Sequence, residues 1–162
     1  MFTPIRNPQP DEEYITIVDN QGRERIQRVE YIVTDVHDET IYITADGLVY
    51  AQDSLMRKGQ DHILEIVDRI PDVLAHPEIV IQDHISPDDT LLYYKQIYIP
   101  MIARHQLMCV VIKIRQGLRF FYNYFPQHSG KVKGHREIPP PAIWYVAPGQ
   151  SPRSYGLPSG DD

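Results

Sequence analysis

The stretch LLYYKQIYIPMIARHQLMCVVIKIRQGLRFFYNYF, residues 91–125, decides the fold of this 162-residue chain. Most of its residues are β-branched or aromatic, which is typical of β-strands. Pro100 interrupts the run because proline cannot donate to a strand ladder, and Arg115-Gln116-Gly117 has the composition of a turn. The stretch therefore predicts three consecutive strands of an antiparallel sheet.

The charge of the chain changes sign in the same region. The first 89 residues hold 19 acidic and 7 basic side chains. Residues 90–136 hold no acid and eight basic side chains, which are Lys95, Arg104, Lys113, Arg115, Arg119, Lys131, Lys133 and Arg136. Basic residues interleaved with Tyr and Phe suit a site that binds a phosphate backbone and stacks bases. Alternatively, the acidic and basic parts neutralise each other in the fold, and the sequence leaves both interpretations open.

Length and composition limit the class of protein. A chain of 162 residues suits one domain with tails. Cys109 is the only cysteine, so an internal disulfide is excluded, and its apolar surroundings LMCVVI predict a buried strand residue. The seven histidines show no metal-binding spacing, and we expect no metal and no other cofactor. Without a signal-like start or an apolar stretch of membrane-spanning length, we expect a soluble, cytoplasmic protein.

The N-terminal part alternates apolar and polar residues. Residues 1–13, with three prolines, predict an extended arm that packs little by itself. Residues 14–53 predict a small antiparallel β subdomain with turns at residues 20–22 and 37–39. Within it, Asp46-Gly47 is a strong signal for a two-residue hairpin. This part carries no cluster of reactive groups, so we expect it to have a structural or partner-binding role.

Residues 54–135 predict an α+β domain. Asp61 can cap a helix over HILEIVDRI, and PDVLA predicts a short second helix that ends before Pro77. Four strands then follow, over residues 78–85, 90–99, 106–114 and 118–125. We therefore expect one or two short helices packed on one face of a four-stranded antiparallel meander, with the other face free as the working surface.

The C-terminal residues 136–162 are rich in proline and have little capacity to form a helix or a central strand. They are either disordered or an extended strap. The consecutive large apolar residues Trp144, Tyr145 and Val146 favour the strap, because a solvated linker seldom keeps such side chains together. We expect the arm and the strap around Trp144 to contact a protein partner.

Short motifs between about residues 60 and 134 resemble a superfamily of small phage-associated and bacterial nucleases. The motifs are, in order, a helix that opens with His62-Ile63, then HPEIV, LLYYK, LMCVVIK and the closing aromatic strand FFYNYF. The superfamily includes barnase, EndoU, the colicin RNases and RelE-like toxins. The match covers about half of the chain.

The resemblance implies a toxin-like RNase that needs no metal and cleaves by attack of the 2′-hydroxyl on the adjacent phosphate. By matching motifs, His62 moves the proton, and Lys95 and Lys113 stabilise the developing negative charge. Tyr122 stands where the family has a short hydroxyl residue, and there it donates a hydrogen bond or stacks on a base. The departure at Tyr122 also leaves open an alternative, a catalytically degenerate member that acts as an interaction or accessory protein.

The same interpretation assigns further residues to RNA binding, which are Tyr94, Arg115, Arg119, Tyr124, Lys131 and Lys133. The length of the turn after Arg115 tests part of this assignment. A two-residue turn at Gln116-Gly117 pairs Lys113 with Phe120, Val111 with Tyr122 and Cys109 with Tyr124. Lys113 and Tyr122 then share a face, whereas a three-residue turn would place them on opposite faces.

Overall fold

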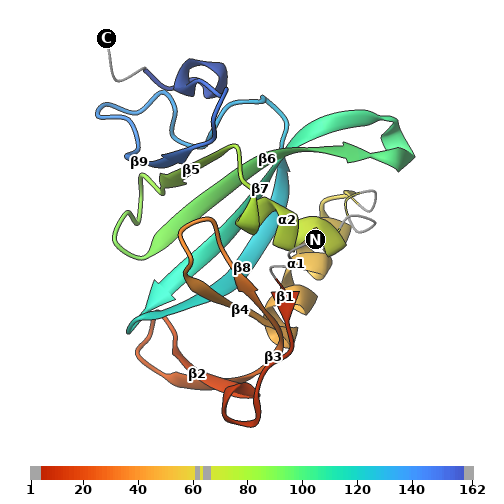
Figure 1. The fold of residues 1–162 in the computed structure, drawn as a ribbon, viewed down its shortest axis with the longest axis vertical. Helices are drawn as coiled ribbons and strands as arrows, with labels where there is room; N and C mark the ends of the chain where they lie inside the picture. Colours follow the sequence, from red (N-terminus) through yellow and green to blue (C-terminus); the bar gives the residue numbers. More distant parts are fainter. Residues whose placement is uncertain (1–4, 61–62, 64–66, 159–162) are drawn as a thin grey trace.

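The structure, a computed structural model, describes residues 5–60, 63 and 67–158. Within these residues the fold is α+β, and nine strands form one largely antiparallel sheet in the order β1-β3-β4-β8-β7-β6-β5-β9, with β2 beside β3 (Figure 1). The strands are β1 (Ile5–Arg6), β2 (Tyr14–Val18), β3 (Glu24–Thr34), β4 (Thr40–Thr44), β5 (Ile79–Gln82), β6 (Thr90–Ile99), β7 (Arg104–Arg115), β8 (Leu118–Gln127) and β9 (Ile143–Val146). The helices are α1 (Ala45–Arg57) and α2 (Ile70–Ala75), and short 3-10 turns are η1 (Pro10–Glu12), η3 (Pro100–Ile102) and η4 (Pro152–Tyr155).

The strands from β5 to β8 pair with their neighbours in chain order, and all three pairings are antiparallel. A parallel pairing then joins β4 to β8, with Ile41 opposite Arg119. Through this pairing the N-terminal strands continue the central sheet. The segment predicted as a small β subdomain therefore shares one sheet with the strands predicted as the nuclease-like domain.

The predicted hairpin at Asp46-Gly47 is wrong, because α1 begins at Ala45. The hydroxyl of Thr44 accepts a hydrogen bond from the Gly47 amide at 3.1 Å, which caps the first turn of the helix. Ala51 and Leu55, four residues apart, are buried against the sheet. Helical packing of this stripe outweighs the local turn preference of Asp-Gly.

The helix α2 agrees with the short helix predicted over PDVLA, and it ends before Pro77. Pro71 lies in its first turn, where the missing amide costs no hydrogen bond. The longer helix predicted over residues 62–70, with its cap at Asp61, falls in part on residues 61, 62 and 64–66, which lie outside the described residues. His62, the predicted proton-transfer residue, is one of them.

Both faces of the central sheet are covered. On one face, Leu55 of α1 and Leu74 of α2 pack with Tyr93 and Phe121. On the other, Leu92, Tyr94 and Cys109 pack against three residues that follow β8, which are Val132, Tyr155 and Leu157. The expectation of a free working face is therefore wrong for this part of the sheet. Consecutive residues of β6 are apolar, so the strand presents apolar side chains to both sides and each side needs a cover.

The arm and the strap pack on their own chain. β1 pairs with β3, and Arg6 forms an ion pair with Glu12 at 2.7 Å. At the far edge of the sheet, β9 pairs with β5, and the Tyr155 hydroxyl donates to Glu78 at 2.7 Å. Figure 1 shows the blue C-terminal segment gathered beside β5 and β9. The extended strap is thus the alternative that the described residues support, and it contacts the protein itself.

The turn between β7 and β8 has two residues, Gln116 and Gly117, and both have positive φ, as a type I′ turn requires. The predicted pairing of Lys113 with Phe120 is confirmed. A β-bulge follows, so that Val111 lies opposite Asn123 and Cys109 opposite Phe125. The predicted pairings of these two residues with Tyr122 and Tyr124 are therefore wrong by one position. The bulge inserts Tyr122 as an unpaired residue.

Candidate functional site

The sheet separates two of the predicted catalytic residues. Lys95 lies on the helix-covered face, where its ammonium nitrogen is 3.3 Å from a carboxylate oxygen of Asp72 in α2. Lys113 lies on the opposite face, because it alternates with Cys109 and Val111, which pack on that side. Its ammonium donates a hydrogen bond to the Thr90 hydroxyl at 2.8 Å. The two lysines cannot act on one phosphate across the sheet.

Lys113 and Tyr122, by contrast, are brought together. The Lys113 ammonium nitrogen is 5.0 Å from the centre of the Tyr122 ring, which is cation–π distance. Tyr122 is 42% exposed, and its ring centre is 6.1 Å from that of Tyr50 in α1. A cation and two accessible aromatic rings therefore share one place on the surface.

These three side chains line a pocket of about 470 Å³, which we name the α1–β8 pocket. Its walls are the end of β2 with the following turn and the start of β3, the first turns of α1, and the paired ends of β7 and β8. Asp46 and Gly47 lie at the α1 wall. A Cβ at Gly47 would be 2.9 Å from the carbonyl oxygen of Phe121, so the absence of a side chain allows α1 to approach β8 this closely.

Arg115 fixes one wall of this pocket. Its guanidinium donates to the carbonyl of Val18 at 2.9 Å and to the amide oxygen of Asn20 at 2.6 Å. Its Nε is 3.6 Å from a carboxylate oxygen of Asp89. Arg115, which we predicted to bind RNA, thus holds the β2–β3 turn against the sheet through two hydrogen bonds and an ion pair.

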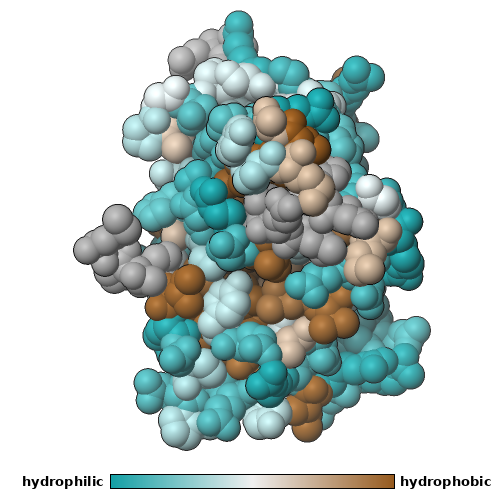
Figure 2. Space-filling view, turned by 90° about the vertical axis from the view of Figure 1, so that its right-hand side faces the viewer, coloured by the Kyte–Doolittle hydropathy of each residue, from teal (hydrophilic) through white to brown (hydrophobic). Residues whose placement is uncertain are grey.

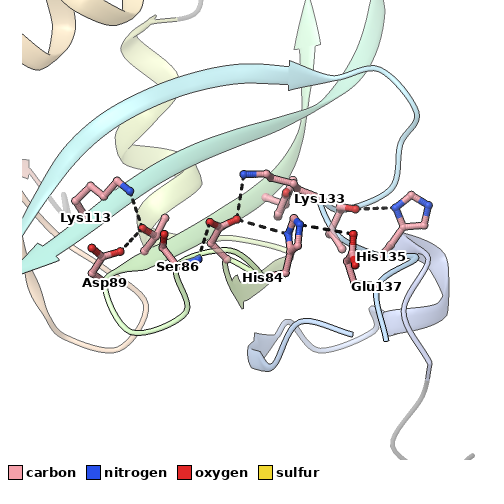
Figure 3. Close-up of polar contacts among 11 residues, drawn as sticks. His84, Ser86, Asp89, Lys113, Lys133, His135 and Glu137 are labelled. Carbon is pink, nitrogen blue, oxygen red and sulfur yellow. Dashed lines mark hydrogen bonds and ion pairs between the residues drawn. The ribbon is translucent and has the colours of Figure 1, made fainter. Parts of the chain in front are cut away.

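The loop between β5 and β6 positions Lys113. The Thr90 hydroxyl accepts from Lys113 and donates to a carboxylate oxygen of Asp89 at 2.7 Å. Figure 3 shows this contact at one end of a row of polar contacts that continues along the loop to the C-terminal segment. Farther along this row, Lys133 is 3.1 Å from Asp83. One loop therefore anchors both the pocket lysine and the cover of the sheet.

The remaining polar contacts leave Lys113 as the uncompensated cation of the pocket. Among the residues that the structure describes, no carboxylate lies within ion-pairing distance of Lys113. Asp19, on the pocket wall, is held by hydrogen bonds from the amides of Arg23 and Gln21 and from the Arg25 side chain, and these lower its pKa. Arg25 also lines the pocket. The pocket wall thus holds two carboxylates, Asp19 and Asp46, and Lys113 is its cation without an ion pair among the described residues.

The tyrosines that we predicted to bind RNA on the sheet are buried. Tyr94 is fully buried, its hydroxyl accepts from the Lys133 amide at 2.9 Å, and burial raises its pKa. Tyr124 is 1% exposed, and burial raises its pKa to about 12. Neither ring can stack on a base in this fold, so these two assignments are wrong.

The basic residues predicted to bind RNA are engaged elsewhere. Arg119 is 3.7 Å from Glu39 and lies over the ring of Trp144. The Lys131 ammonium donates to the carbonyl of Ser154 at 3.2 Å. With the ion pairs of Lys95, Arg115 and Lys133, these contacts support the alternative in which the basic and acidic parts of the chain neutralise each other. Lys113 has no such acidic partner among the described residues, and it lies at the pocket.

Sequence reasoning missed Tyr50 and Asp46, because it placed both beside a predicted hairpin. The signal was available, since Asp46 and Tyr50 are four residues apart and share a face in a helix.

Within the described residues, no group of three or more His, Cys, Asp or Glu side chains is arranged to hold a metal ion. In the same part of the chain, no helix has the length and apolar character to cross a membrane.

Cys109 is buried between β6 and β8, as predicted from its apolar run. Burial raises the pKa of its thiol to about 12, so the thiol stays protonated and unreactive at neutral pH.

Comparisons with protein-family models, with curated proteins and with solved structures found no match.

Proposed function

We propose that the protein binds single-stranded RNA in the α1–β8 pocket and does not cleave it. The observation that carries the proposal is the meeting of Lys113, Tyr122 and Tyr50 at one pocket. A lysine supplies attraction to a phosphate, and accessible aromatic rings supply surfaces on which a base stacks. The proposal corresponds to a degenerate relative of the nuclease superfamily that the sequence resembles.

The shape of the site favours a single strand over a duplex. Stacking on a tyrosine needs a base whose face is free, and bases inside a duplex are already stacked on both faces. A pocket of about 470 Å³ between a helix and a sheet also admits a base that leaves the strand. The position of Lys95, across the sheet from Lys113 and paired with Asp72, supports binding without cleavage.

Fluorescence anisotropy with a labelled single-stranded RNA of about twelve nucleotides tests the binding. We expect Lys113→Gln to weaken binding about tenfold, which equals about 1.4 kcal/mol. Removing one phosphate contact also lowers the slope of log K against log salt by about 0.7. Arg104→Gln is the matched control, because Arg104 is an exposed cation at the start of β7, away from the pocket. Equal losses in both variants would contradict a pocket site.

Cleavage is the second candidate, and the contact between Lys113 and Tyr122 favours it. A cation and a phenolic hydroxyl at one pocket are groups that stabilise a phosphorane-like transition state and donate a proton. Incubating the protein with labelled RNA in EDTA distinguishes the two functions. Cleavage that disappears in both Lys113→Ala and Tyr122→Phe, with RNA binding retained in Tyr122→Phe, would replace the binding function with catalysis.

We expected the arm and the strap to contact a protein partner, but another surface of the protein is better suited to such a contact. Both segments pack on their own chain, whereas α1 exposes Val49 and Met56, each 57% accessible. Figure 2, which looks at the side that carries the two helices, shows apolar groups in a band across its middle. Changing both residues to Asp would abolish binding to a protein partner through this surface and leave RNA binding unchanged.

A further inference from the structure

We infer that the α1–β8 pocket recognises one nucleotide as a unit, with its phosphate at Lys113 and its base against Tyr122 and Tyr50. This inference rests on the proposed function and specifies its ligand. It predicts that a free nucleoside monophosphate binds by itself, without the rest of an RNA strand.

The volume of the pocket sets the size of the ligand. Small-molecule sites span roughly 300 to 1,000 Å³, and the pocket, at about 470 Å³, lies in the lower part of this range. The space suits one base with its sugar and phosphate. Neighbouring nucleotides of a longer strand would lie outside it, over the exposed rim at Arg25.

The phosphate position follows from the surroundings of Lys113. An ammonium group has three donors, and the Thr90 hydroxyl takes one of them. Thr90 is 3% exposed and is held by Asp89, so the lysine is fixed in place before a ligand arrives. Lys113 has no carboxylate partner among the described residues. Its other two donors are therefore available to a phosphate.

The base position follows from the two tyrosines. Tyr50 projects from α1 and Tyr122 from the bulge in β8, with their ring planes 39° apart. Both rings are close to half exposed, at 50% and 42%. Rings at this separation do not stack on each other face to face, so each keeps accessible surface for an added aromatic group. Without the bulge, Tyr122 would be an ordinary paired strand residue.

The lysine and the two aromatic rings contribute separately to the binding free energy of a ligand. A nucleoside contacts the rings and leaves Lys113 without an anion, and inorganic phosphate contacts Lys113 and leaves the rings exposed. A nucleoside monophosphate satisfies both. We therefore expect it to bind at least tenfold more tightly than either the matching nucleoside or inorganic phosphate.

Isothermal titration calorimetry with the full chain tests this expectation. The probes are AMP, CMP, GMP and UMP, the four corresponding nucleosides, and inorganic phosphate. We expect Lys113→Gln and Tyr122→Ala each to weaken binding of a monophosphate about tenfold, and Lys113→Gln to leave the weak nucleoside binding unchanged. Arg104→Gln and Tyr98→Ala are the controls, since each removes an exposed side chain of the same kind at the β6–β7 hairpin.

Each outcome decides between distinct sites. Phosphate that binds as tightly as a monophosphate would show an anion site alone, and a nucleoside that does so would show an apolar site alone. Either result overturns the inference. RNA that binds through Lys113 while no monophosphate binds overturns it too, but leaves the proposed function standing. Failure of both RNA and monophosphates to bind overturns the proposed function itself, with circular dichroism confirming that the variants are folded.

Discussion

Lys95 and Lys113 lie on neighbouring strands of one sheet and have opposite surroundings. On the helix-covered face, Lys95 is 3.3 Å from Asp72, which also pairs with Arg69 at 2.8 Å. On the pocket side, Lys113 donates to a neutral hydroxyl and lies over an aromatic ring. The first lysine completes an ion-pair network within the fold. The second keeps its charge available to a ligand.

This difference shows how an acid-free segment can fold without forming one basic surface. Side chains alternate across a sheet, so residues that are close in sequence divide between two faces with different neighbours. Here the described residues of the acidic N-terminal part supply ion-pair partners to four of the eight basic residues, and these partners are Asp72, Asp89, Glu39 and Asp83. The charge of a segment therefore predicts ligand binding only when the basic residues that form ion pairs within the fold are left out of the count.

The largest expected effect concerns how each face is covered. Leu74 of α2 and Leu157 of the C-terminal segment are both buried, at 0% and 2% exposure, on opposite faces. We expect Leu74→Ala and Leu157→Ala each to lower the free energy of unfolding by about 2–5 kcal/mol, through lost burial and a residual cavity. Urea denaturation followed by circular dichroism measures both. A loss below about 1 kcal/mol for Leu157→Ala alone would mean that the C-terminal segment is a loose cover.

Adjacent tyrosines of β6 provide a finer version of the same comparison. The Tyr93 hydroxyl donates to the buried carboxylate of Asp35 at 2.5 Å, and the Tyr94 hydroxyl accepts from the Lys133 amide. We expect Tyr93→Phe to lower the free energy of unfolding by about 2 kcal/mol, because a buried acceptor loses a donor. Tyr94→Phe should lower it by about 1 kcal/mol. Chemical denaturation of the two variants in parallel gives the difference, and the reverse order would contradict this account.

The close approach of α1 to β8 predicts an effect of about 1 kcal/mol with an unusual sign. In a helix, Gly→Ala ordinarily raises stability by up to about 1 kcal/mol. At Gly47 the added Cβ would meet the Phe121 carbonyl at 2.9 Å, and overpacking of this kind costs about 1–3 kcal/mol. We therefore expect Gly47→Ala to be destabilising and to reduce ligand binding by moving α1. Ser54→Ala, farther along the same helix, is the control in the same thermal-unfolding measurement and should be neutral or stabilising.

Local patterns predicted most strands, because alternation and turn composition are properties of neighbouring residues. The turn at Gln116-Gly117 is an example, since its positive φ values suit those residues. Helix α1 was missed because Asp46-Gly47 is a turn signal at short range, although Ala51 and Leu55 have helical spacing. Deciding between them requires knowing that a sheet lies beneath the helix to bury that stripe.

The site itself depends on contacts that no local pattern contains. The parallel pairing of β4 with β8 joins Ile41 to Arg119, and only this pairing brings α1 beside Tyr122. The bulge at Val111 shifts the register by one residue, so counting from the turn misplaced Tyr122. The sequence predicted that Lys113 and Tyr122 share a face, and the structure brings these two side chains together. The sequence did not show that Lys95 lies on the opposite face from Lys113. That assignment requires the register of β6 on β7, which depends on the 3-10 turn at Pro100 that connects them.

The smallest expected effect lies at the edge of the sheet, in β1. Hydrogen bonds from the Arg6 guanidinium and the Gln9 amide lower the pKa of Glu12 from 4.5 to about 2. Since the pKa of this acid is depressed in the folded state, its contribution is complete above pH 4.5 and is lost as the pH falls towards 2. We expect the amide-exchange protection of β1 to fall over this interval, while that of the central strand β6 stays constant. Glu12→Gln should remove this pH dependence. If the protection of β1 in the unmodified protein is unchanged from pH 5 to pH 2, strand pairing with β3 alone holds the edge.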